Sequence, residues 1–454
     1  MAGGSWLGAA MEDAGTGSVS EPVPAALKTM RLDRVFWSHF SPNLGPGGWV
    51  TGVLLVHLGL DFRWGLAAIL VGNLVGAVPV ALAAVIGPRT GLPQMEGARR
   101  AFGRVGLRLP AFLNWIYCVG WDAVNNVPAA TALIALLAIG GLDAPFWLAL
   151  GVLAGAQMVA SIFGHHVVQA LQKYLGGLLL LVLGAIGLLV LARAGGVPVA
   201  PHPPSAAVFV LATAVLASFN LSWASYSSDY TRYLPADTSP RRVAWLALAG
   251  LLASAVPFQL LGLLTASGIG EASPTAVIGR LQQEAGLLGP VVLAAIALSS
   301  ITGNSFNDNT ASYSLISAGI RVPRVLAAIV TAGLGYALAV AGAGRYADLY
   351  TGYLVVTLYW IAPWIGIVLA DWYLVGDRRA AVDPPGWTLG ATVFAVTTVL
   401  TIALFPVSDL YTGPAARLLG GADIGYYVGF GAAALWYAAA ARARTVSTTT
   451  GTVS

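Results

Sequence analysis

Long apolar runs are the feature that most constrains what this chain can fold into. Stretches of about 20 residues, nearly free of charged side chains, follow one another along most of the sequence, with short polar segments between them. A helix of about 20 residues is about 30 Å long, which is the thickness of the hydrocarbon core of a bilayer. Only 9% of the 454 residues are charged, against about 25% in typical soluble chains. We therefore expect an all-α integral membrane protein rather than a soluble multi-domain protein.

The runs predict about twelve transmembrane helices. A lipid-embedded segment must satisfy its own backbone hydrogen bonds, so it is a helix or part of a closed barrel, and long runs without alternation exclude a barrel. We expect one transmembrane domain over residues 31–444, between disordered tails at residues 1–30 and 445–454. The expected spans are residues 35–60, 64–88, 110–139, 145–163, 168–192, 205–228, 243–268, 287–314, 324–343, 347–372, 387–406 and 423–441.

The distribution of basic residues predicts the orientation. With a cytoplasmic N-terminus, 18 of the 23 Lys and Arg residues fall in cytoplasmic segments and five fall in outer segments. Cytoplasmic loops of membrane proteins carry an excess of Lys and Arg. The bias supports twelve spans with both termini in the cytoplasm. From the short tails and compact loops, we expect the plasma (inner) membrane.

Two of the expected spans are interrupted. Residues 41–48 of the first span read SPNLGPGG, and residues 218–229 of the sixth span read SFNLSWASYSSD. The two interruptions lie about 180 residues apart, and the polar-rich third and eighth spans show nearly the same separation. Broken helices at corresponding positions of two halves are typical of inverted-repeat transporters with a site at the membrane midplane. Proline kinks and small-residue packing are the simpler explanation for any single break.

Residues near the interruptions suit a flat, polar ligand. Trp121 and Asn125 are four residues apart, so they share one helix face. An indole stacks on a planar ring, and a carboxamide offers both a donor and an acceptor. Trp223 is expected to form the opposite wall, and Asn307 to supply a second amide. A tryptophan in a membrane helix is more often an interfacial anchor, but the nearby breaks favour a binding role.

Two acids and a group of hydroxyls are candidates for ion coupling. Asp122 and Asp308 lie deep in the third and eighth spans, where ionisable groups are costly and usually functional. Either carries a proton or a cation, or is held by neighbouring amides as a structural group. Ser299 and Thr302, with backbone carbonyls of the broken first span, are also suited to Na⁺. The alternative for these hydroxyls is bonding to the preceding helical turn.

Other chemistry is not indicated. The single Cys118 allows no intrachain disulfide and no cysteine cluster. The adjacent His165 and His166 point apart on a helix, so we expect no metal site. No phosphate loop, nucleophile motif or basic stripe for nucleic acid is visible, and no obligate protein partner is indicated. We expect no enzyme activity and no cofactor, apart from a coupling H⁺ or Na⁺. A channel would need a continuous polar lining, whereas the polar residues concentrate in four spans.

Three segments resemble a known family. They are residues 225–235 (SYSSDYTRYLP), residues 87–94 (GPRTGLPQ), and Gly120-Trp121 with Asn125. They resemble the nucleobase:cation symporter-1 family, in particular its purine–cytosine permease branch. The resemblance implies two inverted five-helix repeats (helices 1–5 and 6–10), with breaks in helices 1 and 6, followed by two C-terminal helices.

The resemblance also implies residue roles. Trp121 would stack on the base, Asn125 would bind its edge, and Trp223 would close the opposite face. Asn307 would be the amide of the eighth helix, with Asn304 as the nearby alternative. Thr302 would match one cation-site hydroxyl of the family.

One position departs from the family pattern, and one candidate has no assigned side-chain role. Ile301 stands where sodium-coupled members tend to have a second hydroxyl, and this favours H⁺ coupling through Asp122 or Asp308. Ser41, at the first break, is a further candidate substrate contact.

The predicted function is secondary active transport. The chain would import a nucleobase, such as cytosine or a purine, by cation- or proton-coupled symport with alternating access. The alternative is the same fold carrying another small heterocycle, such as a hydantoin, allantoin or a pyrimidine vitamin precursor, or carrying an amino acid.

Overall fold

The computed structural model describes residues 21–162, 165–192, 202–266, 273–320, 322–376, 384–407 and 411–450. In these ranges the regular structure is helical, apart from one isolated antiparallel bridge between Val407 and Thr412. Seven helices in the described ranges are long and apolar enough to cross a membrane: Phe62–Thr90, Arg108–Ile139, Ala206–Ser225, Pro240–Thr265, Pro274–Ser317, Val325–Arg345 and Leu349–Val375. Three shorter apolar helices are Phe146–Ser161, Lys173–Leu189 and Leu389–Leu404. The predicted all-α membrane architecture is confirmed.

The helices follow one another with short connections. In chain order the elements used below are α2 (Asp33–Phe40), η2 (Ser41–Asn43), α3 (Pro46–His57), α4 (Phe62–Ala84), α5 (Ile86–Thr90), α6 (Gln94–Gly97), α7 (Arg99–Gly106), α8 (Arg108–Ile139), α9 (Phe146–Ile162), α10 (His165–Ala192), α11 (Ala206–Leu221), η3 (Ser222–Ser225), α12 (Ser227–Thr231), α13 (Pro240–Thr265), α14 (Pro274–Ala285), α15 (Gly289–Ser317), α16 (Arg324–Gly342), α17 (Tyr346–Leu369), the π-helical turn η7 (Ala370–Val375), α18 (Leu389–Leu404), α19 (Pro414–Leu418) and α20 (Gly425–Thr450).

Both sequence interruptions are breaks in the structure. The first helix ends at Phe40, passes through the 3₁₀ turn η2, and restarts as α3 at Pro46. Gly45 between them is fully extended, with φ −161° and ψ 179°, and a proline suits the first turn of the new helix because its missing N–H has no helical acceptor there. The sixth helix changes at Ser222 from α11 to the 3₁₀ turn η3 and then to α12.

Small residues bring the broken helices close to their neighbours. Gly52 of α3 faces α13, where an added Cβ would lie 2.0 Å from the carbonyl oxygen of Gln259. Gly76 of α4 faces α11, where a Cβ would lie 2.2 Å from the carbonyl oxygen of Ala217. Helix packing in lipid relies on such small residues because no hydrophobic effect drives apolar helices together. Next to these pairs, α8 packs extensively on α15, and η2 of the first break also contacts α15.

Polar contacts close one end of the bundle. Asp229 of α12 accepts hydrogen bonds from the Gln94 backbone N–H at 2.8 Å and from Thr310 Oγ1 at 2.5 Å. Arg232 donates to Tyr313 Oη at 3.1 Å and lies over the Tyr313 ring. These contacts connect the second broken helix to α6 and to α15. They come from the SYSSDYTRYLP segment, so that motif has a structural role at this end.

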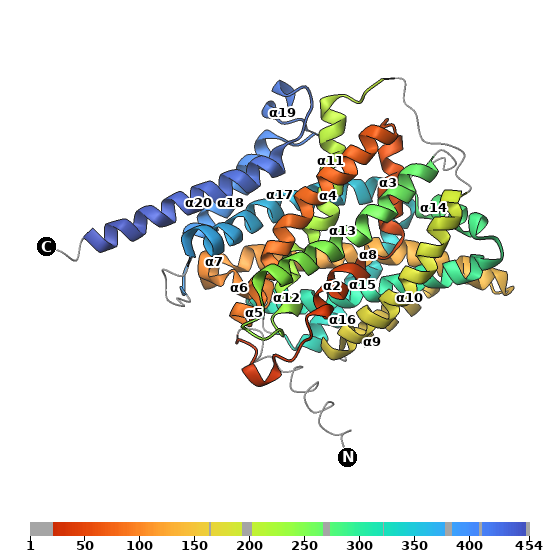
Figure 1. Cartoon of the computed structure of the whole chain (residues 1–454), viewed down its shortest axis with the longest axis horizontal. Helices are drawn as coiled ribbons and strands as arrows, with labels where there is room; N and C mark the ends of the chain where they lie inside the picture. The colour runs from red at the N-terminus through yellow and green to blue at the C-terminus, as the bar shows by residue number, and fades with distance from the viewer. Residues whose placement is uncertain are drawn as a thin grey trace, which may run out of the picture.

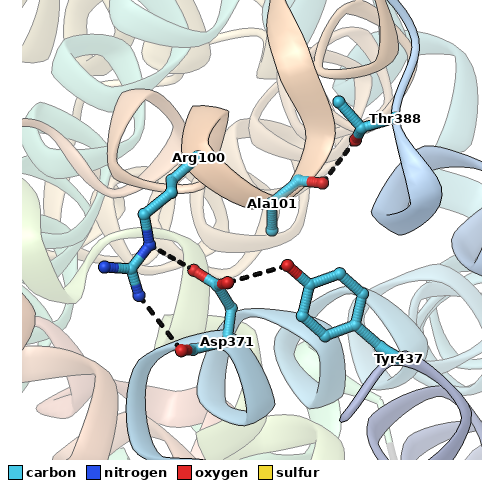
Figure 2. Close-up of polar contacts among 5 residues, drawn as sticks. All are labelled: Arg100, Ala101, Asp371, Thr388 and Tyr437. Carbon is cyan, nitrogen blue, oxygen red and sulfur yellow. Dashed lines mark hydrogen bonds and ion pairs between the residues drawn. The ribbon is translucent and has the colours of Figure 1, made fainter. Parts of the chain in front are cut away.

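An ion pair and hydrogen bonds add to the packing of the last three long helices, α17, α18 and α20, on the rest of the bundle (Figure 2). Arg100 of α7 contacts Asp371 of η7, with 2.6 Å between Nε and Oδ2, and Tyr437 of α20 donates to Asp371 Oδ1 at 2.7 Å. Thr388, next to α18, donates to the carbonyl of Ala101. In Figure 1, α18 and α20 lie at one edge of the bundle and α10 and α14 at the opposite edge.

The described parts of the two predicted tails contain structure. Residues 1–20 lie outside the described ranges, but residues 21–30 contact the bundle: the Val23 N–H donates to the carbonyl of Gly91, and Lys28 Nζ donates to the carbonyl of Pro88 at 2.9 Å. The helix α20 continues to Thr450, beyond the predicted domain end at residue 444. The prediction of tails over residues 1–30 and 445–454 therefore does not match residues 21–30 and 445–450.

Candidate functional site

A cavity opens where the two breaks meet α8 and α15. Its empty space is about 640 Å³ when the part open to solvent is included. The first break, the second break and the two long helices all contribute side chains or backbone. The lining residues are Pro42, Asn43, Gly45, Pro46, Gly47, Gly48, Tyr117, Trp121, Val124, Asn125, Pro128, Phe219, Ser222, Trp223, Tyr226, Ser299, Ser300, Asn307 and Tyr346.

Two indoles line the cavity from different elements. Trp121 of α8 is held edge-to-face by Tyr353 of α17, with 5.6 Å between ring centroids and 82° between planes. Trp223 of η3 has the same type of contact with Phe306 of α15, at 6.1 Å and 81°. Edge-to-face contacts are favoured aromatic geometry, so the planes of both indoles are set before a ligand enters.

One hydrogen bond connects the two breaks across the cavity. Trp223 Nε1 donates to Asn43 Oδ1 at 2.8 Å. Asn43 is itself 6% exposed and donates to Ser254 Oγ of α13 at 3.2 Å. The indole of the sixth helix is thereby positioned by the broken first helix, so a movement of either break changes the wall of the cavity.

Two amides that line the cavity donate hydrogen bonds to a third amide behind them. Asn125 Nδ2 donates to Asn304 Oδ1 at 2.8 Å, and Asn307 Nδ2 donates to the same oxygen at 3.1 Å. Asn307 also accepts from Tyr226 Oη at 2.8 Å. Asn125 and Asn307 line the cavity, whereas Asn304 is fully buried behind them.

The two intramembrane acids form a pair behind the amides. Asp122 and Asp308 are both 0% exposed, and their carboxyl groups interact with each other. Ser161 of α9 donates to Asp308 Oδ2 at 3.2 Å, and Asp122 faces Gly335 of α16. Two such carboxyl groups repel each other strongly in a dry interior when both are ionised.

The hydroxyls of the eighth-helix segment bond to their own helix. Ser299 Oγ donates to the carbonyl of Ile296 at 2.7 Å, and Thr302 Oγ1 donates to the carbonyl of Ser299 at 2.7 Å. Ser299 lies against Gly45 of the first break, where an added Cβ would be 3.1 Å from Ser299 Oγ. These contacts match the alternative in which the hydroxyls bond to the preceding turn of their own helix.

The structure brings together about half of the predicted site residues. The cavity lining contains Trp121, Asn125, Trp223, Asn307 and Ser299. The other candidates are buried outside the lining: Asn304, Thr302, Asp122, Asp308 and Ser41. Ser41 is directed at α10, since a Cβ on Gly176 would lie 1.9 Å from Ser41 Oγ. The interruption that contains Ser41 turns this hydroxyl away from the cavity and turns Asn43 toward it.

Sequence reasoning missed several residues of the site. Tyr117 precedes Trp121 by one turn on the same face, and that spacing was a visible signal. Asn43 and Tyr226 lie inside segments already singled out as interruptions. Gln157, which accepts from Asn304 Nδ2 at 2.8 Å, lies in an apolar span with no distinguishing pattern.

The side chains of this site suit the binding of a small ligand. Aromatic faces, two amides and a tyrosine hydroxyl suit a flat heterocycle with hydrogen-bonding edges. In the part of the chain that the structure describes, no group of three or more His, Cys, Asp or Glu side chains is arranged to hold a metal ion.

Known proteins are similar to this chain in sequence and in fold. Residues 22–429 match the family described as "Permease for cytosine/purines, uracil, thiamine, allantoin". A putative purine-cytosine permease of Bacillus subtilis is 28% identical over 442 residues, covering 92% of this chain and 94% of that protein. The purine-cytosine permease fcyB of Emericella nidulans is 26% identical over 450 residues, covering 92% and 86%.

A solved structure shows the same fold. Mhp1, a nucleobase-cation-symport-1 family transporter in a closed conformation with bromovinylhydantoin bound, superposes with a TM-score of 0.76 at 17% identity, covering 94% of this chain and 95% of that one. The resemblance inferred from the three sequence segments is confirmed. The chain belongs to the family of permeases for cytosine and purines, uracil, thiamine and allantoin, and it is a multi-pass membrane transporter rather than an enzyme.

Proposed function

We propose that this chain is a proton-coupled symporter that imports a nucleobase, such as cytosine or a purine, across the plasma membrane by alternating access. One observation carries the proposal: two tryptophans and two amides from α8, η3 and α15 line a single cavity at the breaks of two helices. The relatives named as purine-cytosine permeases support the substrate class.

The base lies between the two indoles in this proposal. Trp121 and Trp223 present apolar ring faces, which stack on any planar base. Asn125 and Asn307 then contact the polar edge, because both line the same cavity. The first break also brings the backbone of Gly45 and its neighbours to the cavity lining, and unwound backbone contributes to substrate sites in transporters.

The full architecture is part of the proposal. Twelve spans in two inverted five-helix repeats plus two C-terminal helices are supported by the separation of about 180 residues between η2 and η3. Both termini are cytoplasmic, as the distribution of basic residues indicates. In this orientation, the contacts of Asp229 and Arg232 with α6 and α15 close the cytoplasmic end of the pathway. These contacts break when the transporter opens inward.

Coupling uses the acid pair. Asp122 and Asp308 are buried next to the amide groups, since Asn304 Nδ2 donates to the backbone carbonyl of Asp122 at 3.3 Å. A proton on the pair removes the repulsion between the carboxyl groups and stabilises the packing of α8 on α15. If the base stabilises the same conformation, then binding of each ligand favours the other. Sodium coupling at Ser299 and Thr302 is the second candidate, because Ser299 lies beside the unwound first helix.

Uptake into proteoliposomes tests the function. We expect saturable accumulation of radiolabelled cytosine or hypoxanthine driven by an inward proton gradient and not by a sodium gradient. Accumulation driven by Na⁺ alone would reject the acid pair as the coupling site. Absence of uptake of either base, in vesicles that contain folded protein, would reject the substrate class and lead to a panel of hydantoins, allantoin, vitamin precursors and amino acids.

A variant separates coupling from binding. Asp308→Asn retains the shape of the side chain but cannot give up a proton. We expect it to lose gradient-driven accumulation while still exchanging labelled base for unlabelled base across the membrane. Normal proton-driven accumulation by Asp308→Asn and also by Asp122→Asn would show that neither acid carries the coupling proton.

A further inference from the structure

A second cavity lies beside the candidate substrate site, between α8, α16 and α17. Its empty space is about 590 Å³ when the part open to the surroundings is included. Its lining includes Ala123 and Val127 of α8 and Ala339 of α16. Val124 and Tyr346 line this cavity and also the candidate substrate site. The two spaces therefore share a wall.

The polar side chains in the lining of the second cavity are bonded within the protein. In the described lining these are the hydroxyls of Tyr346, Tyr350 and Tyr353. Tyr346 and Tyr353 donate to backbone carbonyls of α8 at 3.1 and 2.5 Å, and Tyr350 Oη lies 3.0 Å from Thr51 Oγ1. An ion, a base or a water molecule would lose hydrogen bonds on entering such a space. The occupant that fits is therefore apolar.

One edge of the second cavity lies on the surface of the bundle. Leu338 of α16 and Leu349 of α17 line the cavity and are 47% and 46% exposed. All three surrounding helices are among those long and apolar enough to cross a membrane. In a bilayer this edge therefore faces hydrocarbon. A lipid chain that enters gains van der Waals contacts with the lining, which an empty space lacks.

A basic residue lies in the connection between two of these helices. Arg345 ends the 3₁₀ turn η6 (Ala343–Arg345), which joins α16 to α17, and its side chain is exposed. Connections between membrane spans lie at the level of the lipid headgroups, where a guanidinium forms strong hydrogen bonds with phosphate. A phospholipid suits this arrangement better than an uncharged hydrocarbon does.

The shared wall connects the second cavity to the binding of the base. Tyr346, Tyr350 and Tyr353 recur every three or four residues, so they lie on one face of α17. Tyr346 stacks on Tyr350 with 5.5 Å between ring centroids, and Tyr353 holds the indole of Trp121 edge-to-face at 5.6 Å. A displacement of this tyrosine face would move the surface on which Trp121 packs.

We propose that the second cavity binds one acyl chain of a membrane phospholipid, and that this chain supports the tyrosine face of α17 against the substrate site. Without the chain, the tyrosine face moves into the empty space, Trp121 loses its fixed orientation, and the base binds less tightly. The supporting role rests on the proposed function, whereas the presence of the chain does not.

Photolabelling tests whether the chain is present. The full-length protein is placed in vesicles of phosphatidylcholine that contain a small fraction of phosphatidylcholine with a diazirine halfway along one acyl chain. After illumination, mass spectrometry locates the adducts. We expect adducts on Ala123 and Val127, which are buried but line the second cavity. Ala339→Phe fills the cavity, so we expect these adducts to fall by about fivefold or more.

Two further variants separate occupancy from folding. Ala337→Phe is the matched control, because Ala337 is on the same helix but is exposed and lies outside the lining. We expect it to be labelled on α8 like wild type. Leu338→Trp narrows the opening from its exposed position, and we expect the same fall of about fivefold. If Ala339→Phe does not fold, the labelling of Leu338→Trp decides.

Uptake kinetics test the supporting role. Leu338→Trp excludes the chain but leaves space behind the tyrosine face, so we expect the KM for labelled cytosine or hypoxanthine to rise by about threefold or more. Ala339→Phe puts an aromatic ring in the place of the chain, so we expect a KM close to that of wild type.

The two measurements can fail separately. Adducts confined to the exposed residues of α16 and α17, or equal labelling of α8 in Ala339→Phe and wild type, would overturn the chain site. Lost labelling with an unchanged KM in Leu338→Trp, or an equal rise of KM in both variants, would overturn the supporting role. The expected labelling in a folded protein that transports neither base would support the chain site and contradict the proposed function.

Discussion

The hydrogen bond between Trp223 and Asn43 provides a sharp test of how the two helix breaks cooperate. Trp223 Nε1 and Asn43 Oδ1 are 2.8 Å apart, and they belong to η3 and η2. Trp223→Phe keeps an aromatic ring for stacking but removes the N–H. Asn43, which is 6% exposed, then has a buried carbonyl oxygen that has lost its indole donor.

The expected change in KM follows from the cost of leaving the Asn43 oxygen without its donor. Leaving a buried acceptor without its donor costs about 1–3 kcal/mol, which corresponds to about 5- to 150-fold in an equilibrium constant. Because part of this cost falls on the ligand-free protein, we expect the KM for the transported base to rise by about tenfold. The maximal rate should change less, since the stacking ring remains.

Initial uptake rates in proteoliposomes measure both parameters. Trp387→Phe is the matched control, because it also removes an indole donor, to Thr392 Oγ1 at 2.8 Å, but at a residue that is 51% exposed. A double-mutant cycle with Asn43→Ala isolates the pair, and we expect a coupling energy of about 1 kcal/mol or more. A KM for Trp223→Phe within twofold of wild type, or additive effects in the cycle, would refute the cooperation of the two breaks.

Three other substitutions test separate parts of the structure. Gly52→Ala puts a methyl group 2.0 Å from a backbone carbonyl oxygen of α13, so we expect the protein to lose about 1–3 kcal/mol of stability and to melt at a lower temperature. Gly155→Ala is the control, because an added Cβ there has no atom within 4 Å, and it should melt like wild type. Equal melting temperatures for the two variants would contradict the packing. Asp371→Asn removes the ion pair with Arg100 (Figure 2). We expect a loss of about 1.5–3 kcal/mol of stability and an unchanged KM. A changed KM would show that this ion pair affects the transport pathway. Asp229→Ala removes the contacts of Asp229 with Gln94 and Thr310 at one end of the bundle. We expect the buried Cys118 to react with a maleimide at least five times faster. An unchanged rate would show that other contacts close this end.

Much of the architecture follows from local sequence. The medium leaves helices as the available structure for long apolar runs, so the all-α fold could be predicted without knowledge of packing. The two interruptions were visible because Gly, Pro and clustered polar residues do not sustain a membrane helix. The shared face of Trp121 and Asn125 follows from helical periodicity, and both residues line the cavity.

The arrangement within the site required the tertiary structure. Asn304 and Asn307 lie three residues apart on one helix, and periodicity gives their relative direction but not which of them faces the cavity. That choice depends on how α15 rotates against α8 and α9, where Gln157 and the Asp122 carbonyl bind Asn304.

The first break shows the same limit. Ser41 and Asn43 belong to one irregular segment, and the turn η2 directs Ser41 to α10 and Asn43 to Trp223. The hydrogen bond that Trp223 donates to Asn43 joins residues 180 positions apart. Local sequence determined that these residues are polar and sit in broken helices, and the packing of the helices decided which of them meet, because contacts between distant segments depend on the relative positions of whole helices.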